Sequence, residues 1–507
     1  MEIHDYTWLF VLGLLFSMLD AYGIGANDVA NSFSTSVASK SLTLAQACCI
    51  AIFTEFFGAF LLGSGTAETI RGKIIDLNKF NGQPELLMLA MVCAVMGSSC
   101  WVLFATRQGW PVSTTHSIVG AMIGVGIAAF GVNSVDWSYT GVAKIVTSWF
   151  VSPVAAGIIA SIIYMSTKYL VLVKPNSFER GLRAIPFYFG LTAFVCIFYV
   201  LQKGAPDLNL QDITPGIIWG STIGATLLVI LFCWFFIAPW FRRTICEKEN
   251  LKWYHVFIIP ILSPRPPVIE QKMELGGEEK GNLEIENEEE AKPTTFLGKI
   301  KNTILNGVRK DVVTCKEERL QKIHDAADRY DDDTEYMYSF IQVVTASMAS
   351  FAHGSNDVAN SVGPLSTIYY IWSTATIDVE GKTPVPLWVL AMGGLFIDIG
   401  LITYGYKIMR SLGNKITYHS PSRGFSMELG SCLTVLTASK IGLPVSTTHC
   451  ITGATAAVGL CNGSAKTINW RMLAWCFFSW FLTLPAAGLV AGLLFSFASY
   501  APKLISV

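Results

Sequence analysis

Two short stretches of this 507-residue chain place a carboxyl group between two amide side chains, beside strongly apolar sequence. Residues 23–33 read GIGANDVANSF, and residues 352–362 read AHGSNDVANSV. In a helix, Asn27 and Asn31 are spaced i, i+4 and Asp28 and Asn31 are spaced i, i+3, so the three side chains share a face. Carboxylate and amide oxygens together suit a hard cation such as Na⁺. The second copy places the same residue types at Asn356, Asp357 and Asn360.

A second motif also occurs twice, and its chemistry suits an anion. GWPVSTTHSIVGA at 109–121 recurs as GLPVSTTHCITGA at 442–454. Proline is favoured in the first turn of a helix, so Pro111 and Pro444 predict helices that begin inside apolar segments. The free N–H groups and the positive dipole end of such a helix favour an anion. A helix cap needs only one hydroxyl, so the three consecutive hydroxyls predict anion ligands. These hydroxyl triplets are Ser113, Thr114 and Thr115, and Ser446, Thr447 and Thr448.

The composition places both motifs in a membrane protein. Hydrophobic residues make up 52% of the chain and charged residues 14%, with a mean hydropathy of +0.47. Soluble domains typically contain about 25% charged residues. A bilayer-spanning helix needs about 20 mostly apolar residues, and the chain offers about twelve such segments, about seven of them before residue 241. The net charge of −1 gives no indication of nucleic-acid binding.

A polar stretch divides the apolar segments into two membrane halves. The predicted boundaries are 1–241 for the first half, 242–335 for a largely disordered loop, and 336–507 for the second half. The loop contains GGEEKGNLEIENEEE, a composition typical of disorder. Its later part, KEERLQKIHDAADRYDDDTEYMYSF, has helical spacing and predicts a short amphipathic helix. The lysine and arginine bias of the short loops predicts that both termini are outside and the central loop is cytosolic. The plasma membrane is the simplest location.

The order of the repeated motifs predicts the architecture. Both motifs described above, and SWFVSPVAAG at 148–157 with its copy SWFLTLPAAG at 479–488, recur after roughly 330 residues. An odd number of spans separates the two copies of the first motif, so the halves must cross the membrane in opposite directions. Inverted repeats with a site near the midplane are typical of secondary transporters. We therefore expect an all-α polytopic fold of two inverted-topology repeats, with broken half-helices at the substrate site.

The pairing of a cation-type and an anion-type motif in each half indicates the substrate. Two half-helix starts facing each other across a pseudo-two-fold axis suit a small tetrahedral oxyanion. Asp28 and Asp357 would repel it unless cations bridge the charges, or unless a protonated ligand oxygen donates to a carboxylate. The second arrangement favours phosphate over sulfate, because phosphate still carries a proton at about pH 7. The arrangement in which cations bridge the charges would couple transport to a cation.

The motifs resemble those of the PiT family of inorganic phosphate transporters. GANDVANSF, GSNDVANSVGPL and the paired PVSTTH segments carry this resemblance, and LDAYGIGANDVANSFSTSVASKSL is similar to fungal high-affinity sodium–phosphate symporters of that family. The resemblance implies a transporter rather than an enzyme, with no cofactor, that takes up phosphate with Na⁺, or with H⁺ as in bacterial and plant branches. It implies phosphate ligands at Asp28, Asp357 and the hydroxyl triplets, and sodium ligands at Asn27, Asn31, Asn356 and Asn360.

Two further acids within apolar segments are candidate sodium ligands. Glu55 lies in IFTEFFGAFLLG and Glu428 in FSMELGSC, and the family carries functionally important glutamates in similar segments. The alternative for each is a glutamate at a helix end in the membrane interface. Glu428 aligns with Val95 in the first half, which argues against a symmetric role. Relatives from animals carry an acid where this chain has Met91, which leaves the cation stoichiometry open.

His116 and His449 end the two PVSTTH motifs. A histidine can relay protons, but one turn into a helix a structural hydrogen bond is the simpler interpretation. Small-residue patterns such as GAMIG are compatible with a homodimer, yet they occur in any packed membrane protein.

Three other functions compete with phosphate symport. A cation exchanger would use paired acids and amides but would not need the hydroxyl triplets. An intramembrane aspartic protease needs two aspartates but no repeated asparagine-rich frame around them. A phosphate sensor that binds without transporting would have the same site.

Overall fold

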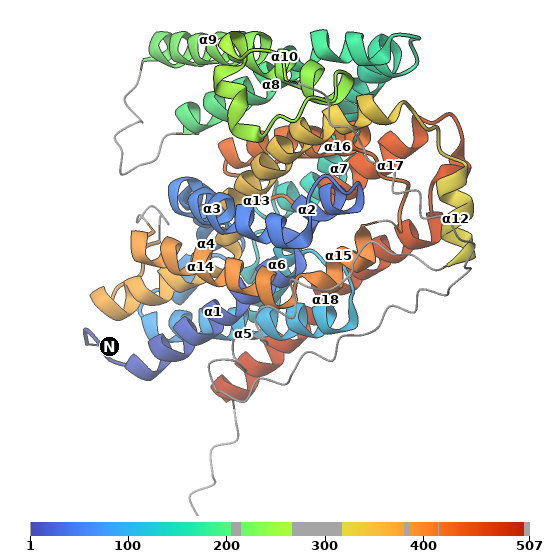
Figure 1. Ribbon diagram of the computed structural model, residues 1–507. Helices are drawn as coiled ribbons and strands as arrows, with labels where there is room; N and C mark the ends of the chain where they lie inside the picture. The colour runs from blue at the N-terminus through green and yellow to red at the C-terminus, as the bar shows by residue number, and fades with distance from the viewer. Residues whose placement is uncertain (1, 204–213, 266–316, 380–384, 414, 501–507) are drawn as a thin grey trace, which may run out of the picture.

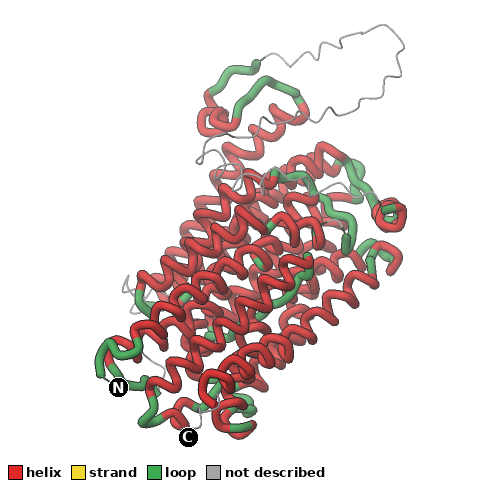
Figure 2. The backbone as a smooth tube through the Cα atoms, turned by 90° about the horizontal axis from the view of Figure 1, so that it is seen from below, coloured by secondary structure: helices red, strands yellow, loops and turns green. Residues whose placement is uncertain are grey.

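The computed structural model describes residues 2–203, 214–265, 317–379, 385–413 and 415–500. Within these ranges every regular element is a helix, apart from isolated bridge residues such as the pair Ile75 and Val135. The long helices pack side by side in one bundle (Figure 1, Figure 2). The all-α prediction is confirmed for the described part of the chain.

Eight helical stretches of the described residues are long and apolar enough to cross a membrane. They are Thr7–Ala38, Leu44–Leu62, Pro84–Gln108, Val142–Leu172, Ser177–Gln202, Pro215–Cys246, Leu387–Tyr404 and Trp470–Tyr500. Four other helices fall short of this standard because they are shorter or more polar: α6 (Thr114–Phe130), α13 (Asp332–Thr374), α16 (Pro421–Lys440) and α17 (Thr447–Leu460).

The first repeated motif lies inside long helices in both halves. α1 (Thr7–Asn27) and α2 (Val29–Ala38) form one helix interrupted only at Asp28. α13 runs without interruption for 43 residues through Asp357. The motif therefore lies in the middle of a helix rather than at its end.

Local sequence determines where the neighbouring helices begin and end. α3 (Leu44–Leu62) starts with a capping box, in which the Thr43 hydroxyl accepts from the Gln46 N–H and the Gln46 side chain accepts from the Thr43 N–H. α5 (Pro84–Gln108) starts at a proline and stops at Gly109, whose φ of 73° only glycine adopts readily. α7 (Val142–Thr167), α14 (Leu387–Tyr404) and α18 (Trp470–Tyr500) complete the helices that enclose the motifs.

The predicted boundaries of the central loop fall inside helices. The helical run that begins with α9 (Pro215–Phe232) continues to Cys246, and α13 begins at Asp332. The predicted short helix of the loop corresponds to α12 (Glu318–Asp325). GGEEKGNLEIENEEE lies outside the described residues.

Close helix contacts occur in reciprocal pairs between the two halves. Gly25 of α1 packs directly on the backbone of Ile397 in α14, and Gly354 of α13 packs in the same way on the backbone of Glu55 in α3. A second such pair consists of Gly97 on Ala491 and Gly430 on Ala160. Each contact joins helices of different halves, and each has a counterpart with the halves exchanged.

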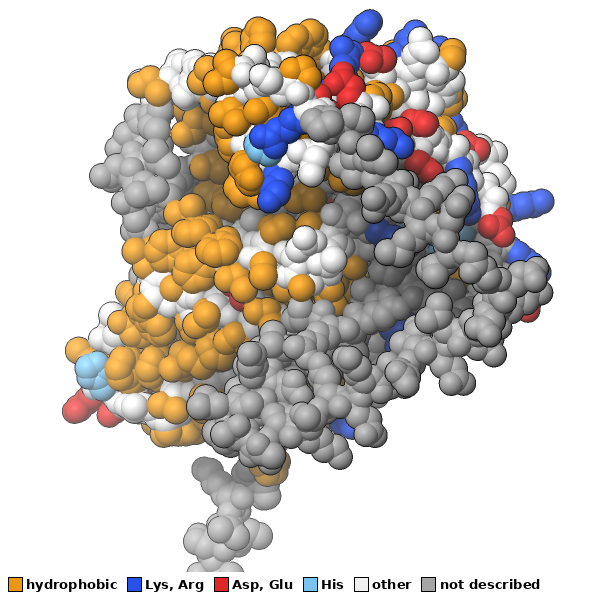
Figure 3. Space-filling view, viewed as in Figure 1, with side chains coloured by type: hydrophobic (Ala, Val, Ile, Leu, Met, Phe, Trp, Pro, Cys, Tyr) orange, Lys and Arg blue, Asp and Glu red, His pale blue; other side chains and the backbone are white. Residues whose placement is uncertain are grey.

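The surface of the bundle suits a lipid environment. Hydrophobic side chains cover the face over α1, α3 and α14, whereas Lys, Arg, Asp and Glu side chains gather mostly toward the upper and right edges of the view (Figure 3). α9, which lies with α8 (Ser177–Lys203) and α10 (Ala238–Phe241) at the top of Figure 1, exposes Ile217, Leu227 and Leu228. The start of α1 and the end of α18 lie at the same end of the bundle (Figure 2).

Candidate functional site

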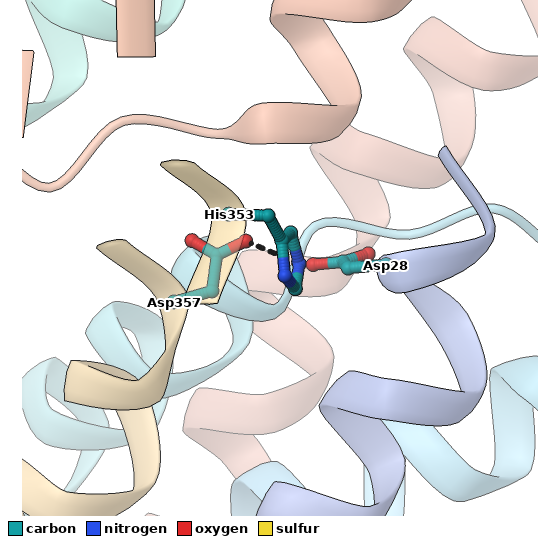
Figure 4. A group of neighbouring side chains, drawn as sticks. All are labelled: Asp28, His353 and Asp357. Atoms are coloured by element: carbon teal, nitrogen blue, oxygen red, sulfur yellow. Dashed lines mark ion pairs between the residues drawn. The ribbon is translucent and has the colours of Figure 1, made fainter. Parts of the chain in front are cut away.

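The two repeated aspartates meet inside the bundle with a histidine between them. Asp28, His353 and Asp357 are buried, and one side-chain atom from each lies within 4.8 Å of the others. His353 Nε2 is 2.9 Å from Asp357 Oδ2, and the Asp28 carboxyl approaches the other side of the imidazole (Figure 4). The α1–α2 helix and α13, which are far apart in sequence, thus bring three titratable groups to one point.

The half-helices begin at serine caps rather than at prolines. Ser113 caps α6 and Ser446 caps α17, and each hydroxyl accepts a hydrogen bond of 3.3 Å from the backbone N–H three residues later. Pro111 and Pro444 lie two residues before these caps in extended segments. The prediction that the prolines occupy the first turn is therefore wrong, because the extended backbone of a serine cap starts each helix instead.

The first threonine of each triplet donates to the aspartate of its own half. Thr114 Oγ1 lies 2.6 Å from Asp28 Oδ2, and Thr447 Oγ1 lies 2.7 Å from Asp357 Oδ2. Both half-helices therefore point their N-terminal ends at the paired carboxyl groups. Asp28 also accepts from Thr448 of the other half at 3.1 Å.

The second threonine of each triplet contacts the asparagine of the opposite half. Asn31 Nδ2 donates to Thr448 at 2.7 Å, and Asn360 Nδ2 donates to Thr115 at 3.3 Å. These two hydrogen bonds are counterparts with the halves exchanged. The Oδ1 atoms of both asparagines are buried and make no hydrogen bond within the described residues, so each offers an oxygen toward the site.

The other two asparagines hold the extended segments before the half-helices. Asn27 Nδ2 donates to the backbone oxygen of Trp110 at 3.1 Å, and Asn27 Oδ1 accepts from the N–H of Val112 at 3.1 Å. Asn356 Nδ2 donates to the backbone oxygen of Val445 at 2.8 Å. Asn27 therefore has its amide oxygen occupied, whereas Asn356 Oδ1 makes no hydrogen bond in the described chain.

Glu55 joins the site through His353. Its Oε2 lies 2.8 Å from His353 Nδ1, and its Oε1 accepts from Ser350 at 2.7 Å. The side chain is fully buried, which excludes the alternative of a glutamate at the membrane interface. The imidazole thus bridges two carboxyl groups and lies close to a third.

Glu428 forms a separate cluster. Its Oε1 accepts from Thr35 at 2.6 Å, Ser36 at 2.5 Å and Gln342 at 3.1 Å, and its Oε2 accepts from Thr345 at 2.6 Å. Four donors stabilise this fully buried carboxylate, which has no basic partner in the described part of the chain. α2 connects the cluster to the central site, because it carries Asp28 at its start and the two hydroxyls further along.

The two motif histidines meet behind the half-helix starts. The rings of His116 and His449 have centroids 4.6 Å apart. His116 stacks on Trp149 at 3.7 Å, and His449 stacks on Trp480 at 3.8 Å. Their packing against aromatic rings agrees with the structural interpretation.

The sequence reasoning missed His353 and two buried acids. His353 stands one turn before Asp357, where the first copy of the motif has Ile24. The repetition of the motif therefore does not reveal His353. Asp20 in α1 and Asp398 in α14 are nearly inaccessible to solvent. An acidic residue inside an apolar segment is a sufficient signal for both.

The site can bind cations and an anion together. Asp28, Asp357 and Glu55 share one imidazole, so a negative charge remains if all three are ionised. The free amide oxygens offer further ligands to a cation. The half-helix N-termini and their hydroxyls are oriented toward the same point, where they can bind the oxygens of an anion.

Comparisons with known proteins agree with this chemistry. The chain matches the phosphate transporter family (PHO4) over residues 24–491. It is 39% identical to the phosphate-repressible phosphate permease pho-4 of Neurospora crassa, over 99% of both chains. It is 30% identical to sodium-dependent phosphate transporter 2 of Felis catus, again over 99% of both chains.

A solved structure, described as "The sodium-dependent phosphate transporter", has a TM-score of 0.71 and 29% identity, and the match covers 98% of this chain and 100% of that one. The relatives are transporters and permeases rather than enzymes, and the resemblance inferred from the motifs is confirmed. With a family match that spans both motif pairs, the chain belongs to the phosphate transporter family.

Proposed function

We propose that this protein imports inorganic phosphate by symport with Na⁺. The observation that carries the proposal is the convergence of two half-helix N-termini on a pair of buried aspartates. A neutral substrate would not need the helix ends, and a cation alone would be repelled by them.

Phosphate would bind where the threonine hydroxyls now donate to the carboxyls. Thr114 and Thr447 can turn their hydroxyls from Asp28 and Asp357 to phosphate oxygens, and the second threonines lie beside them. A protonated phosphate oxygen can then donate to one of the carboxylates. The phosphate ligands in this proposal are Asp28, Asp357 and the two hydroxyl triplets, with Ser113 and Ser446 acting through helix capping.

Sodium would neutralise the carboxyl groups while phosphate is bound. Asn31, Asn356 and Asn360 offer free amide oxygens beside the aspartates, whereas Asn27 has its oxygen occupied. Glu55 acts on the site through His353. Glu428, which α2 connects to the central site, forms a second position for Na⁺. Several relatives carry the name sodium-dependent phosphate transporter, which supports Na⁺ over H⁺ as the coupling ion.

The fold proposed for this activity has twelve membrane segments in two inverted repeats. The eight apolar spans and the four shorter or more polar helices together give that number. The reciprocal glycine contacts and the exchanged Asn31–Thr448 and Asn360–Thr115 hydrogen bonds support the pseudo-two-fold relation. In this arrangement 1–241 and 336–507 form the membrane halves, and 242–335 forms the connecting loop.

We further propose that the protein resides in the plasma membrane with both termini outside. The shared position of the start of α1 and the end of α18 supports placing both on one side (Figure 2). The lysine and arginine bias supports a cytosolic central loop.

Labelled phosphate uptake into proteoliposomes tests the function. We expect uptake to follow an imposed inward Na⁺ gradient and to be small with choline in its place. Uptake driven by a proton gradient alone would make H⁺ the coupling ion. Phosphate binding without uptake under either gradient would identify a sensor, and Na⁺ flux that is independent of phosphate would identify a cation exchanger.

A further inference from the structure

A carboxyl group outside the paired-aspartate site lies in α1 without a basic partner among the described residues. Asp20 is 1% exposed, and neither of its carboxyl oxygens makes a hydrogen bond within the described residues. Ser17, one turn earlier on the same helix face, and Ser98 of α5 are fully buried. Their hydroxyl oxygens also lack partners in the described chain. Four buried oxygen atoms in one region thus lack a hydrogen bond of good geometry within the described residues.

These oxygens belong to one cluster at the interface of α1 and α5. The two helices run parallel, since Gly23 packs on Val102 and Asn27 donates to Thr106 at 2.9 Å. This register places Ser98 opposite Asp20, and the two side chains interact.

A bare carboxylate is costly at this position. Burying an unpaired charge costs several kcal/mol or more, and intramembrane acids usually face a partner, an ion or a cavity. Two carboxyl oxygens and two hydroxyl oxygens are the ligand types that a hard monovalent cation accepts. A bound cation would balance the charge and satisfy all four atoms.

The cluster is specific to the first half and lies to one side of the central site. In the second half, Ala346 and Ala349 occupy the positions that correspond to Ser17 and Asp20. Asp20 precedes Asp28 by two helical turns, about 12 Å along α1. α1 and α13 are antiparallel, because Gly13 of α1 packs on Ile368, which follows Asp357 in α13.

Glu428 lies on the other side of the central site. Its partners Gln342 and Thr345 precede Asp357 in α13, so they lie toward the end of the bundle where α13 begins. Asp20 of the first half and Glu428 of the second half therefore flank the paired aspartates along the helix axes. This order, from Asp20 through Asp28 to Glu428, is the order expected of stations along a cation path.

We propose that Asp20, Ser17 and Ser98 form a Na⁺ site between the outer end of α1 and the paired aspartates. The proposal rests on the proposed sodium symport and extends it by a binding position. A cation held there would approach Asp28 from the side where α1 begins.

The test compares Na⁺ binding by the purified full-length protein and by its Asp20→Asn variant. Thermal unfolding is followed against NaCl concentration without phosphate, with choline chloride holding the ionic strength constant. We expect the Na⁺ concentration for half-maximal stabilisation to rise about tenfold in Asp20→Asn. In proteoliposomes, the Na⁺ concentration for half-maximal uptake should rise by the same factor, while the phosphate KM at saturating Na⁺ stays unchanged.

The double variant Ser17→Ala/Ser98→Ala removes two ligands and keeps the carboxyl group. It should shift the Na⁺ dependence in the same direction by about threefold, and it decides the question if Asp20→Asn does not fold. Ser439→Ala is the matched control, because its buried hydroxyl on α16 also lacks a partner in the described residues.

Unchanged Na⁺ dependence in both variants would overturn the proposal. A change confined to the pH dependence of uptake would overturn it as well, since Asp20 would then hold a proton. If the wild type shows no Na⁺-driven uptake, symport fails, but the unfolding measurement still decides whether Asp20 binds Na⁺.

Discussion

His353 connects the carboxyl groups of the central site at the scale of single residues. It links Glu55 and Asp357 through its two ring nitrogens and lies beside Asp28. The aspartates and the hydroxyl triplets could be predicted from the sequence because they are repeated. His353 could not, because only one copy of the motif contains it, and nothing in the spacing reveals that Glu55 of another helix reaches it.

Replacing either aspartate by its amide should abolish phosphate uptake. Asp28→Asn and Asp357→Asn keep the size of the side chain but remove the charge that holds a cation and accepts from a protonated phosphate. Labelled uptake should fall to background while the protein still elutes as a folded species. Asp136→Asn, in the exposed loop before α7, is the control and should retain uptake. Near-normal uptake in either site variant would exclude that carboxylate from the mechanism.

Removing the imidazole should destabilise the protein through the acids that it bridges. His353→Leu leaves Glu55 and Asp357 buried without their shared partner, a change that costs about 3 kcal/mol. Adding Glu55→Gln to His353→Leu should recover part of this loss, because one of the stranded charges is then removed. Thermal unfolding of the two single variants and the double variant measures the coupling. If the effects of the two substitutions on stability are additive, the bridge between Glu55 and His353 makes no net contribution to the free energy of unfolding.

The half-helices α6 and α17 show at the scale of elements how one sequence motif serves three purposes. In each triplet the serine caps the helix, the first threonine contacts the aspartate of its own half, and the second contacts the asparagine of the other half. The sequence predicts the half-helices and the direction of their N-termini. It does not predict this division of roles. The directions in which three adjacent hydroxyls point can be assigned only when the residue at which the helix starts is known.

Threonine and serine substitutions should separate binding from helix capping. Thr114→Val and Thr447→Val keep the shape but remove a donor to the site, so we expect the phosphate KM to rise at least about tenfold. Ser113→Ala should instead lower stability by about 1 kcal/mol through loss of the cap. Thr147→Val on the exposed face of α7 serves as the control. Normal uptake in both threonine variants would favour the cation-exchanger interpretation.

At the scale of the whole molecule, the reciprocal glycine contacts hold the two halves together. Eight helical stretches of the described residues meet a hydropathy criterion, but α13 and α16 carry buried polar side chains of the proposed site, which lower their apolar character. The residues of the proposed site therefore hide these helices from a hydropathy criterion. Motif repetition marks α13, which carries the second copy of the first motif, because repetition does not depend on how apolar the segment is.

Alanine at the reciprocal glycines should prevent the halves from packing. At Gly25 and Gly354 a Cβ would collide with the backbone of the opposite half, and backbone cannot shift as a flexible side chain does. We expect Gly25→Ala and Gly354→Ala each to reduce the yield of folded protein severely in a size-exclusion assay. At Gly220 on α9 an added Cβ would meet no atom within 4 Å outside its own helix backbone, so Gly220→Ala should behave as wild type. Tolerance at one glycine but not at its counterpart would argue against equivalent packing.

The predicted orientation can be checked with a membrane-impermeant thiol reagent on intact cells. Asn81 and Asn176 are both exposed, in the loops before α5 and α8 respectively. The variants Asn81→Cys and Asn176→Cys each introduce one cysteine. Only the cysteine at position 81 should react with the reagent above the background of native cysteines. The reverse pattern would place the termini in the cytosol.

The exchanged hydrogen bonds between asparagine and threonine have a consequence for the direction of transport. Asn31–Thr448 and Asn360–Thr115 are chemically identical, and each is worth about 1 kcal/mol. A rearrangement that breaks one pair to open one side and the other pair to open the opposite side would therefore have nearly equal cost in both directions. Under the proposed symport, such a protein would have little built-in preference for the inward-open or the outward-open state, and a reversed ion gradient should drive phosphate out.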